Sequence, residues 1–118
     1  MPAQPTIWHN PKCGTSRKVL SLLNERGIEP RIVEYLKTPP TREELVGLLA
    51  QLRMTPRQLL RRKEAAFAEL RLDDPAKTGD DLIDAMLAHP ILMERPIVAT
   101  DKGTALCRTA EKVLEIIG

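Results

Sequence analysis

The stretch from Thr6 to Tyr35 carries the pattern that most limits how this chain can fold. A short apolar run at residues 6–9 precedes a segment whose apolar side chains recur at helical spacing, and Gly27 ends that segment. A β-rich run at residues 31–35 follows. Two strands joined by a helix pair in parallel through a right-handed crossover. We therefore expect a βαβ unit whose first loop lies at the C-terminal edge of the sheet, where α/β folds bind ligands.

The middle of the chain carries the signals of several helices. Capping residues predict three helix starts, at Thr41 with Glu44, at Thr55 with Pro56 and Gln58, and at either Thr78 or Asp80. The last of these helices is expected to end before Pro90. We therefore interpret residues 38–90 as a helical insertion.

The β pattern returns near the C-terminus, at residues 97–100 and 104–107. The connection between these two runs is so short that the strands must be antiparallel. A final helix is expected to start near Thr109. The order βαβ, helical insertion, ββα predicts an α/β fold with a thioredoxin-like mixed sheet of about four strands. We expect a single domain over residues 1–118 that includes the helical insertion.

The amino-acid composition argues against several kinds of binding partner. The net charge of +2 is too small to indicate nucleic acid binding, and aromatic residues at 3% leave no base-stacking platform. No apolar stretch approaches the length of a membrane span, so we expect no membrane partner and a cytoplasmic location. The two cysteines are far apart and lack metal-ligand spacing, so neither a metal site nor a disulfide framework is predicted.

Cys13 stands between the first predicted strand and the first predicted helix. A helix N-terminus presents unpaired N–H groups and a partial positive charge, which favour a thiolate and attract anions. An ordinary cysteine is only about 3% ionised at neutral pH, so the surroundings decide its reactivity. Pro11 and Gly14 are loop residues that favour a thiol near the surface over a buried small apolar side chain. Ser16 stands where a second cysteine would be needed for a local disulfide cycle.

Several motifs share the order and spacing of one known family. The longest is the run at residues 9–17, which reads His-Asn-Pro-Lys-Cys-Gly-Thr-Ser-Arg. The others are Glu34-Tyr35-Leu36, Leu59-Leu60-Arg61, His89-Pro90-Ile91-Leu92 with Arg95-Pro96-Ile97-Val98, and Leu106-Cys107-Arg108. From Thr6 to its C-terminus the chain resembles the glutaredoxin- and glutathione-coupled arsenate reductase family.

The resemblance implies a role for each matched residue. Cys13 is then the nucleophile, and His9 is the histidine that helps to keep it ionised. The arginines that bind the oxyanion match Arg61, Arg95 and Arg108. Thioredoxin-like proteins also place a cis-proline just before the third strand, so the resemblance predicts a cis peptide bond at Pro96.

Arginine side chains are well suited to bind an oxyanion. Guanidinium groups are fixed cationic forks that pair with several oxygens at once, and they would also favour a thiolate. We expect arsenate to bind these arginines and the backbone N–H groups of Gly14, Thr15 and Ser16, while the Cys13 thiolate attacks arsenic. The resemblance implies that glutathione then acts as co-substrate and glutaredoxin as partner, with no bound cofactor.

Some of these residues also have a simpler structural interpretation. Arg61 stands in a basic cluster at residues 57–63, which could be a solvated helix face. His9 is either a satisfied structural histidine or a partner of the thiolate. Arg17 is expected on the exposed side of the first helix. Core positions are expected for Cys107, Trp8 and Tyr35.

Two other functions stay open on the sequence. A glutathione-dependent thiol reductase of the same superfamily, acting on substrates other than arsenate, would use the same nucleophile; the three arginines argue against it. A redox-responsive regulator that binds RNA polymerase would share the fold. Such regulators commonly use a Cys-x-x-Cys switch, and Ser16 removes the second thiol here.

Overall fold

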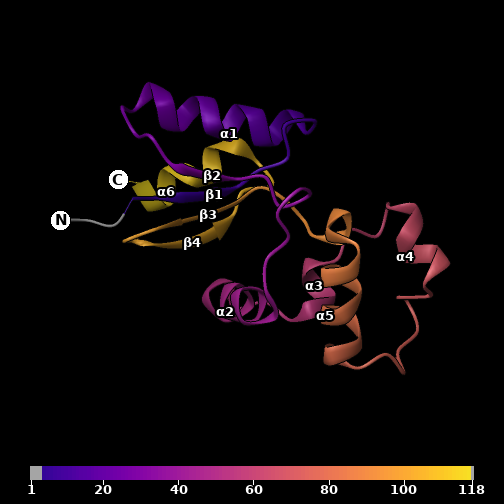
Figure 1. Cartoon of the computed structure of the whole chain (residues 1–118). Helices are drawn as coiled ribbons and strands as arrows, with labels where there is room; N and C mark the ends of the chain where they lie inside the picture. Colours follow the sequence, from indigo (N-terminus) through magenta and orange to yellow (C-terminus); the bar gives the residue numbers. More distant parts are fainter. Residues whose placement is uncertain (1–3, 118) are drawn as a thin grey trace. The chain divides into compact units, whose positions relative to one another are not determined.

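The computed structural model describes residues 4–117, and the chain divides into two compact units. One unit contains the chain up to Thr38 and from Arg95 onward, and the other is Pro39–Glu94. All four strands belong to the first unit, whereas helices α2 to α5 belong to the second (Figure 1).

The first unit is built on a four-stranded sheet with the strand order β2-β1-β3-β4. The strands are β1 (Thr6–Trp8), β2 (Arg31–Val33), β3 (Ile97–Thr100) and β4 (Gly103–Leu106). Strand β1 pairs in parallel with β2 and antiparallel with β3, and β3 pairs antiparallel with β4. The predicted mixed sheet, with its βαβ opening and antiparallel closing pair, is therefore confirmed.

Helix α1 (Gly14–Glu25) connects β1 to β2, and the unit ends in a 3-10 turn, η2 (Ala110–Val113), followed by α6 (Leu114–Ile117). These helical segments share one buried core with the sheet, made of Ile7, Val19, Leu23, Val98, Cys107, Ala110, Val113 and Ile116. Gly27 has φ +73, a left-handed conformation that suits glycine, and it follows the end of α1 as predicted.

Two boundaries differ from the prediction. The second strand ends at Val33, because the Glu34 carbonyl accepts hydrogen bonds from the N–H groups of Lys37 and Thr38, each at 2.9 Å, and turns the chain. The last helix is not continuous from near Thr109, since its first turn is 3-10. Both differences lie at element ends, where local hydrogen bonding rather than side-chain pattern decides.

The second unit contains α2 (Arg42–Leu52), α3 (Pro56–Leu59), α4 (Ala65–Glu69), α5 (Gly79–Ala88) and the 3-10 turn η1 (Pro90–Leu92). Three of these helices begin with complete capping boxes, at Thr41 with Glu44, Thr55 with Gln58, and Thr78 with Asp81. Thr78, and not Asp80, is thus the cap of α5. Helix α4 was not predicted, and none of its residues is buried.

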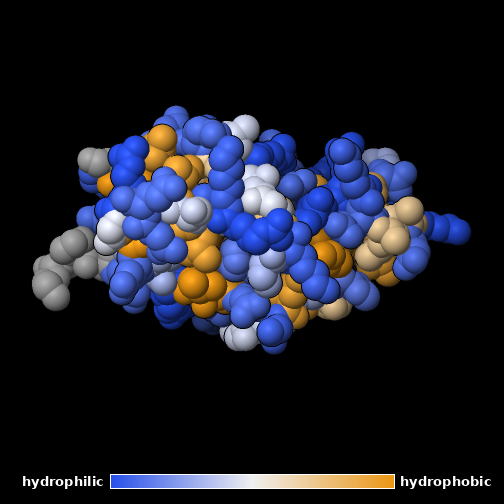
Figure 2. Space-filling view, turned by 90° about the horizontal axis from the view of Figure 1, so that it is seen from above, coloured by the Kyte–Doolittle hydropathy of each residue, from blue (hydrophilic) through white to orange (hydrophobic). Residues whose placement is uncertain are grey.

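The surface in Figure 2 is mostly hydrophilic, with apolar residues in separate small patches. Ile32, Leu36, Val46 and Leu70 are the exposed large apolar side chains of the described region. No helix within residues 4–117 combines the length and apolar character needed to cross a membrane.

Candidate active site

Cys13 is the N-cap residue of α1, with an extended backbone at φ −91 and ψ 123. Its side chain is half-buried and makes no capping hydrogen bond. The Arg17 N–H donates to the Cys13 carbonyl at 3.0 Å, so Gly14, Thr15 and Ser16 form the first turn. Their N–H groups precede the first intrahelical acceptor. The thiol therefore stands beside the positive end of a three-turn helix, as predicted.

The loop before α1 is held by hydrogen bonds at both of its ends. Asn10 closes a turn, because its carbonyl accepts from Cys13 N–H at 3.0 Å and its Oδ1 accepts from Lys12 N–H at 3.0 Å. The Nη1 atom of Arg17 donates to the Pro11 carbonyl at 2.9 Å. These hydrogen bonds hold the loop that carries Cys13 in a defined conformation.

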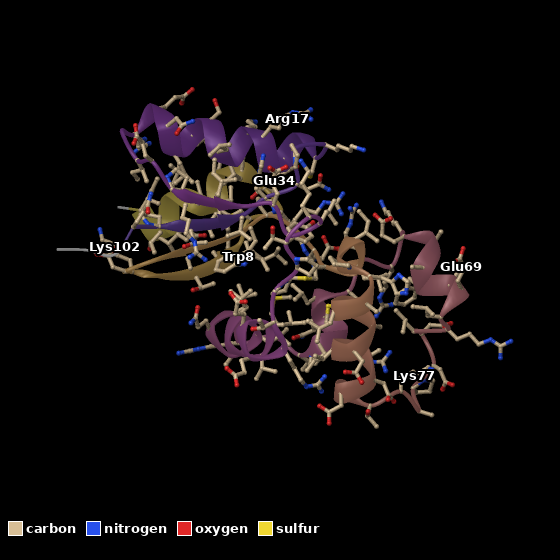
Figure 3. All side chains as sticks on the ribbon, viewed as in Figure 1. Trp8, Arg17, Glu34, Glu69, Lys77 and Lys102 are labelled. Carbon is tan, nitrogen blue, oxygen red and sulfur yellow. The ribbon has the colours of Figure 1, made fainter. Side chains whose placement is uncertain are left out.

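His9 and Ser16 form a buried pair beneath this loop. The Nδ1 atom of His9 lies 2.7 Å from the Ser16 Oγ, and the Asn10 N–H donates to the same oxygen at 3.1 Å. Burial lowers the pKa of His9, the Arg17 charge lowers it further, and Glu34 acts in the opposite direction. Arg17 and Glu34 are labelled in Figure 3, on α1 and just after β2. Burial of the ring therefore favours the neutral form of His9.

Strand register places the ends of three strands in one row. Trp8, the last residue of β1, pairs with Ile97, the first of β3, and Ile97 pairs with Leu106, the last of β4. The ladder continues by one step, because Cys107 N–H donates to the Pro96 carbonyl at 2.9 Å. This edge of the sheet is where β1 leads into the Cys13 loop.

Two of the predicted arginines lie at this edge. Arg95 directly precedes Pro96, and Arg108 directly follows Cys107. The Arg95 side chain is half-buried and Arg108 is exposed. The peptide bond between Arg95 and Pro96 is cis, as the resemblance predicted. Both arginines belong to the same compact unit as Cys13.

Arg61 belongs to the other unit, Pro39–Glu94. Its backbone is fixed by a 2.7 Å hydrogen bond to the Leu92 carbonyl. Its guanidinium forms ion pairs with Glu64, where Nη1 and Oε1 are 3.1 Å apart, and with Glu94, where Nε and Oε2 are 4.0 Å apart. Arg61 follows α3 and is half-buried, so it does not lie on a solvated helix face.

Its neighbour Arg57 has a different role that the sequence did not reveal. Its guanidinium donates to the carbonyls of Leu72, Asp74 and Lys77 at 2.9, 3.2 and 3.3 Å. Arg57 thus fixes the loop before α5. Arg57 and Arg61 of the basic cluster therefore have separate partners.

Cys107 is fully buried, at 0% exposure, and burial raises its pKa to about 11. Its Sγ lies 3.8 Å from the Ala105 carbonyl. The predicted core position is confirmed, as it is for Trp8 and Tyr35. Among residues 4–117 no group of three or more His, Cys, Asp or Glu side chains could hold a metal ion.

Three contributors to the loop were not predicted from the sequence. Asn10 and the Ser16 hydroxyl are buried hydrogen-bonding groups, and Arg17, although exposed as predicted, also binds the Pro11 carbonyl. Asn10 before Pro11 is a turn signal that could have revealed the first of these. The Ser16 and Arg17 contacts depend on loop geometry, for which the sequence carries no local signal.

Comparison with known proteins agrees with this arrangement. The family model described as the ArsC family matches residues 8–116. Arsenate reductase from Rhizobium meliloti is 53% identical over 112 residues, which cover 95% of this chain and 80% of that protein. For arsenate reductase from Escherichia coli K12 the identity is 54%, with 95% and 79% covered. The structure of an arsenate reductase from Vibrio cholerae superposes with a TM-score of 0.92 at 44% identity, covering 96% of this chain and 97% of that one. The chain therefore belongs to the ArsC family.

Proposed function

We propose that this protein is an oxidoreductase that reduces arsenate to arsenite, with Cys13 as its nucleophile. The observation that carries the proposal is the position of Cys13. Cys13 is the half-buried N-cap residue of a twelve-residue helix, at the sheet edge that also holds Arg95 and Arg108. The relatives named arsenate reductase match the chain across this whole region.

The first step forms a bond between sulfur and arsenic. The Cys13 thiolate attacks the arsenic of arsenate, and one oxygen leaves as water after it is protonated. The N–H groups of Gly14, Thr15 and Ser16 and the guanidiniums of Arg95 and Arg108 would carry the negative charge of the remaining oxygens. The family resemblance adds Arg61 to these groups. Arsenic is still pentavalent in this adduct.

The second step transfers two electrons. A glutathione thiolate attacks the Cys13 sulfur, so that a sulfur–sulfur bond forms and the sulfur–arsenic bond breaks. The electron pair of the broken bond stays on arsenic, which leaves as arsenite. A glutaredoxin thiol then takes the glutathione from the mixed disulfide and returns Cys13 to its thiol form.

The thiols that supply the electrons have to come from outside the chain. The sequence contains only two cysteines, and Cys107 is fully buried. Ser16 replaces the nearby thiol that would resolve the adduct internally. The family resemblance implies glutathione as this co-substrate and glutaredoxin as the partner, and we propose that the protein works without a bound cofactor in a reducing cytoplasmic compartment.

The test is NADPH oxidation driven by arsenate, in the presence of glutathione, glutaredoxin and glutathione reductase. We expect turnover to stop when any one component is left out. Cys13→Ser should abolish turnover, whereas Cys107→Ala, the matched control at the other cysteine, should retain it. Turnover by Cys13→Ser, or turnover without glutathione, would contradict the scheme.

A separate measurement distinguishes arsenate from other substrates of a thiol reductase. Arsenate should slow the alkylation of Cys13 by iodoacetamide in a concentration-dependent way, because the oxyanion occupies the site in front of the thiol. A glutathione-dependent reductase that does not act on arsenate would show the same alkylation rate with and without it.

A further inference from the structure

Arg61 lies in a cluster of three charged side chains within the unit Pro39–Glu94. Its Nη1 atom is 3.1 Å from Glu64 Oε1, and its Nε atom is 4.0 Å from Glu94 Oε2. The side chains of Arg61, Glu64 and Glu94 are 22%, 26% and 24% exposed. Charges that are partly removed from water are screened less than those of a surface ion pair. The charge of Arg61 is therefore already compensated by carboxylates before any ligand binds.

Backbone hydrogen bonds bring the three residues of this cluster together. The segment after α3 pairs with the segment after η1 in antiparallel fashion, because the Arg61 N–H donates to the Leu92 carbonyl at 2.7 Å and the Glu94 N–H donates to the Leu59 carbonyl at 2.9 Å. The Glu64 N–H donates to the Arg61 carbonyl at 3.3 Å, so a turn returns Glu64 to the same place. The backbone therefore fixes where the Arg61 side chain begins, independently of the two carboxylates.

The two carboxylates contact Arg61 without forming directed hydrogen bonds to it. Within residues 4–117, Arg61 Nη1 is buried and has no hydrogen-bond acceptor of suitable geometry, although Glu64 Oε1 is 3.1 Å away. The 4.0 Å between Nε and Glu94 Oε2 is too long for a hydrogen bond. A carboxylate that orients an arginine usually does so through two parallel N–H···O bonds. Glu64 and Glu94 thus neutralise the guanidinium but leave the N–H of Nη1 without an acceptor.

We propose that Glu64 and Glu94 compete with arsenate for the guanidinium of Arg61. The inference rests on the proposed function, in which Arg61 is one of the groups that bind the oxyanion. An oxyanion that reaches Arg61 takes over its charge from the carboxylates and supplies the oxygen that Nη1 lacks. Separating Arg61 from its two carboxylates costs free energy, so the two glutamates weaken the binding of arsenate and thereby set its affinity.

A positioning role for the two carboxylates predicts the opposite effect on binding. If Glu64 or Glu94 held the guanidinium in the orientation that binds arsenate, its replacement by glutamine would weaken binding. If the carboxylates compete with arsenate, the same replacement strengthens binding, because glutamine keeps the size and an acceptor oxygen but not the charge. The direction of the change therefore distinguishes the two roles.

The test measures how well arsenate protects Cys13 from iodoacetamide, in the absence of glutathione. Glu64→Gln should lower the arsenate concentration that halves the alkylation rate by about three- to ten-fold. Glu94→Gln, which removes the longer contact, should lower it by about two-fold. Glu69→Gln is the matched control, because it removes the same charge from an exposed side chain of α4 (Figure 3), and it should leave this concentration unchanged.

Arg61→Met separates a failure of this inference from a failure of the proposed function. It should weaken the protection of Cys13 by arsenate, because the guanidinium is lost. If arsenate protects the unmodified protein but Arg61→Met is protected equally well, or if Glu64→Gln brings no gain, the inference is wrong and the proposed function stands. If arsenate does not protect the unmodified protein, the proposed function fails and the inference fails with it.

Carbon-13 NMR of the glutamate carboxyl groups follows the contact in the unmodified protein, so it decides the matter even if a glutamine variant does not fold. At an arsenate concentration that protects Cys13, the signals of Glu64 and Glu94 should move towards that of the exposed Glu69, because their contact with Arg61 is lost. Signals that stay in place while Cys13 is protected would overturn the inference.

Discussion

Cys13 and Cys107 belong to the same compact unit, and both follow a strand: Cys13 stands a short loop after β1, and Cys107 comes directly after β4. Cys13 is half-buried at the N-cap of α1, beside N–H groups that have no intrahelical partner. Cys107 is fully buried in the core, and its nearest polar neighbour is the Ala105 carbonyl at 3.8 Å. One thiol faces donors and a positive helix end, whereas the other faces aliphatic side chains and an acceptor.

The two free cysteines have different roles in this protein. Burial raises the pKa of Cys107 to about 11, so this thiol stays neutral and contributes to packing. Cys13 is instead half-buried at a helix N-terminus, a position at which anions bind. The place of each cysteine in the fold therefore determines how reactive its thiol is.

The largest expected contrast is in alkylation. In the native protein near pH 8, iodoacetamide should modify Cys13 at least about 1,000 times faster than Cys107, because a thiol with a pKa of about 11 is roughly 0.1% ionised there and is also inaccessible. Mass spectrometry of peptides after timed quenching measures both rates. Denaturant should remove the contrast. Native Cys107 labelled as fast as Cys13 would contradict the assignment.

Cys107 should also make stability depend on alkaline pH. Its folded pKa of about 11 lies above the ordinary value of 9.0, so the neutral thiol is favoured by folding. This contribution is complete below pH 9 and is lost as the pH rises through 11, by roughly 2–3 kcal/mol in total. The free energies of unfolding in urea of the unmodified protein and of Cys107→Ala should therefore converge as the pH rises above 9 and cross toward pH 11. Parallel stability curves would contradict it.

Local signals in the sequence predicted most of the fold. The capping boxes at Thr41 and Thr55 were found as predicted, because a cap is decided by residues three positions apart. The parallel pair of β1 and β2 and the antiparallel pair of β3 and β4 followed from connection lengths and apolar runs, whereas the pairing of β1 with β3 was not predicted. The boundary at Val33 did not, since the turn that ends β2 depends on backbone hydrogen bonds to Glu34.

Some features of the active site were likewise predictable from local sequence pattern, and others were not. The position of Cys13 at a helix start followed from local pattern. The partners of Arg57 lie 15 to 20 residues further along the chain, and nothing near Arg57 in the sequence indicates them. The contact between His9 and Ser16 likewise depends on how the loop between them folds back. Local sequence pattern therefore does not predict hydrogen bonds between residues that lie far apart in the chain.

Removing the buried sulfur should affect stability and not catalysis. Cys107→Ala leaves a small cavity in the core cluster to which Val98 and Val113 also belong, and should lower the free energy of unfolding by about 1–2 kcal/mol. Arsenate turnover per folded molecule should stay the same. Denaturant unfolding and the coupled assay on one preparation measure both quantities. A loss of turnover without a loss of stability would give Cys107 a role that its burial does not explain.

The smallest expected effect concerns how the Cys13 loop is held. Arg17 donates to the Pro11 carbonyl from an exposed side chain, so this hydrogen bond is worth at most about 0.5–1.5 kcal/mol. Arg17→Met should slow Cys13 alkylation about two- to five-fold, whereas Lys18→Met, at the next exposed position, should not.

Arg17→Lys separates charge from geometry, because lysine keeps the positive charge but lacks the planar fork that reaches the carbonyl. If the fork holds the loop, the lysine variant should react as slowly as the methionine variant. Full recovery with lysine would mean that Arg17 acts on Cys13 through its charge alone. The contrast between the two cysteines would then depend on the electrostatic field around Cys13 more than on the shape of its loop.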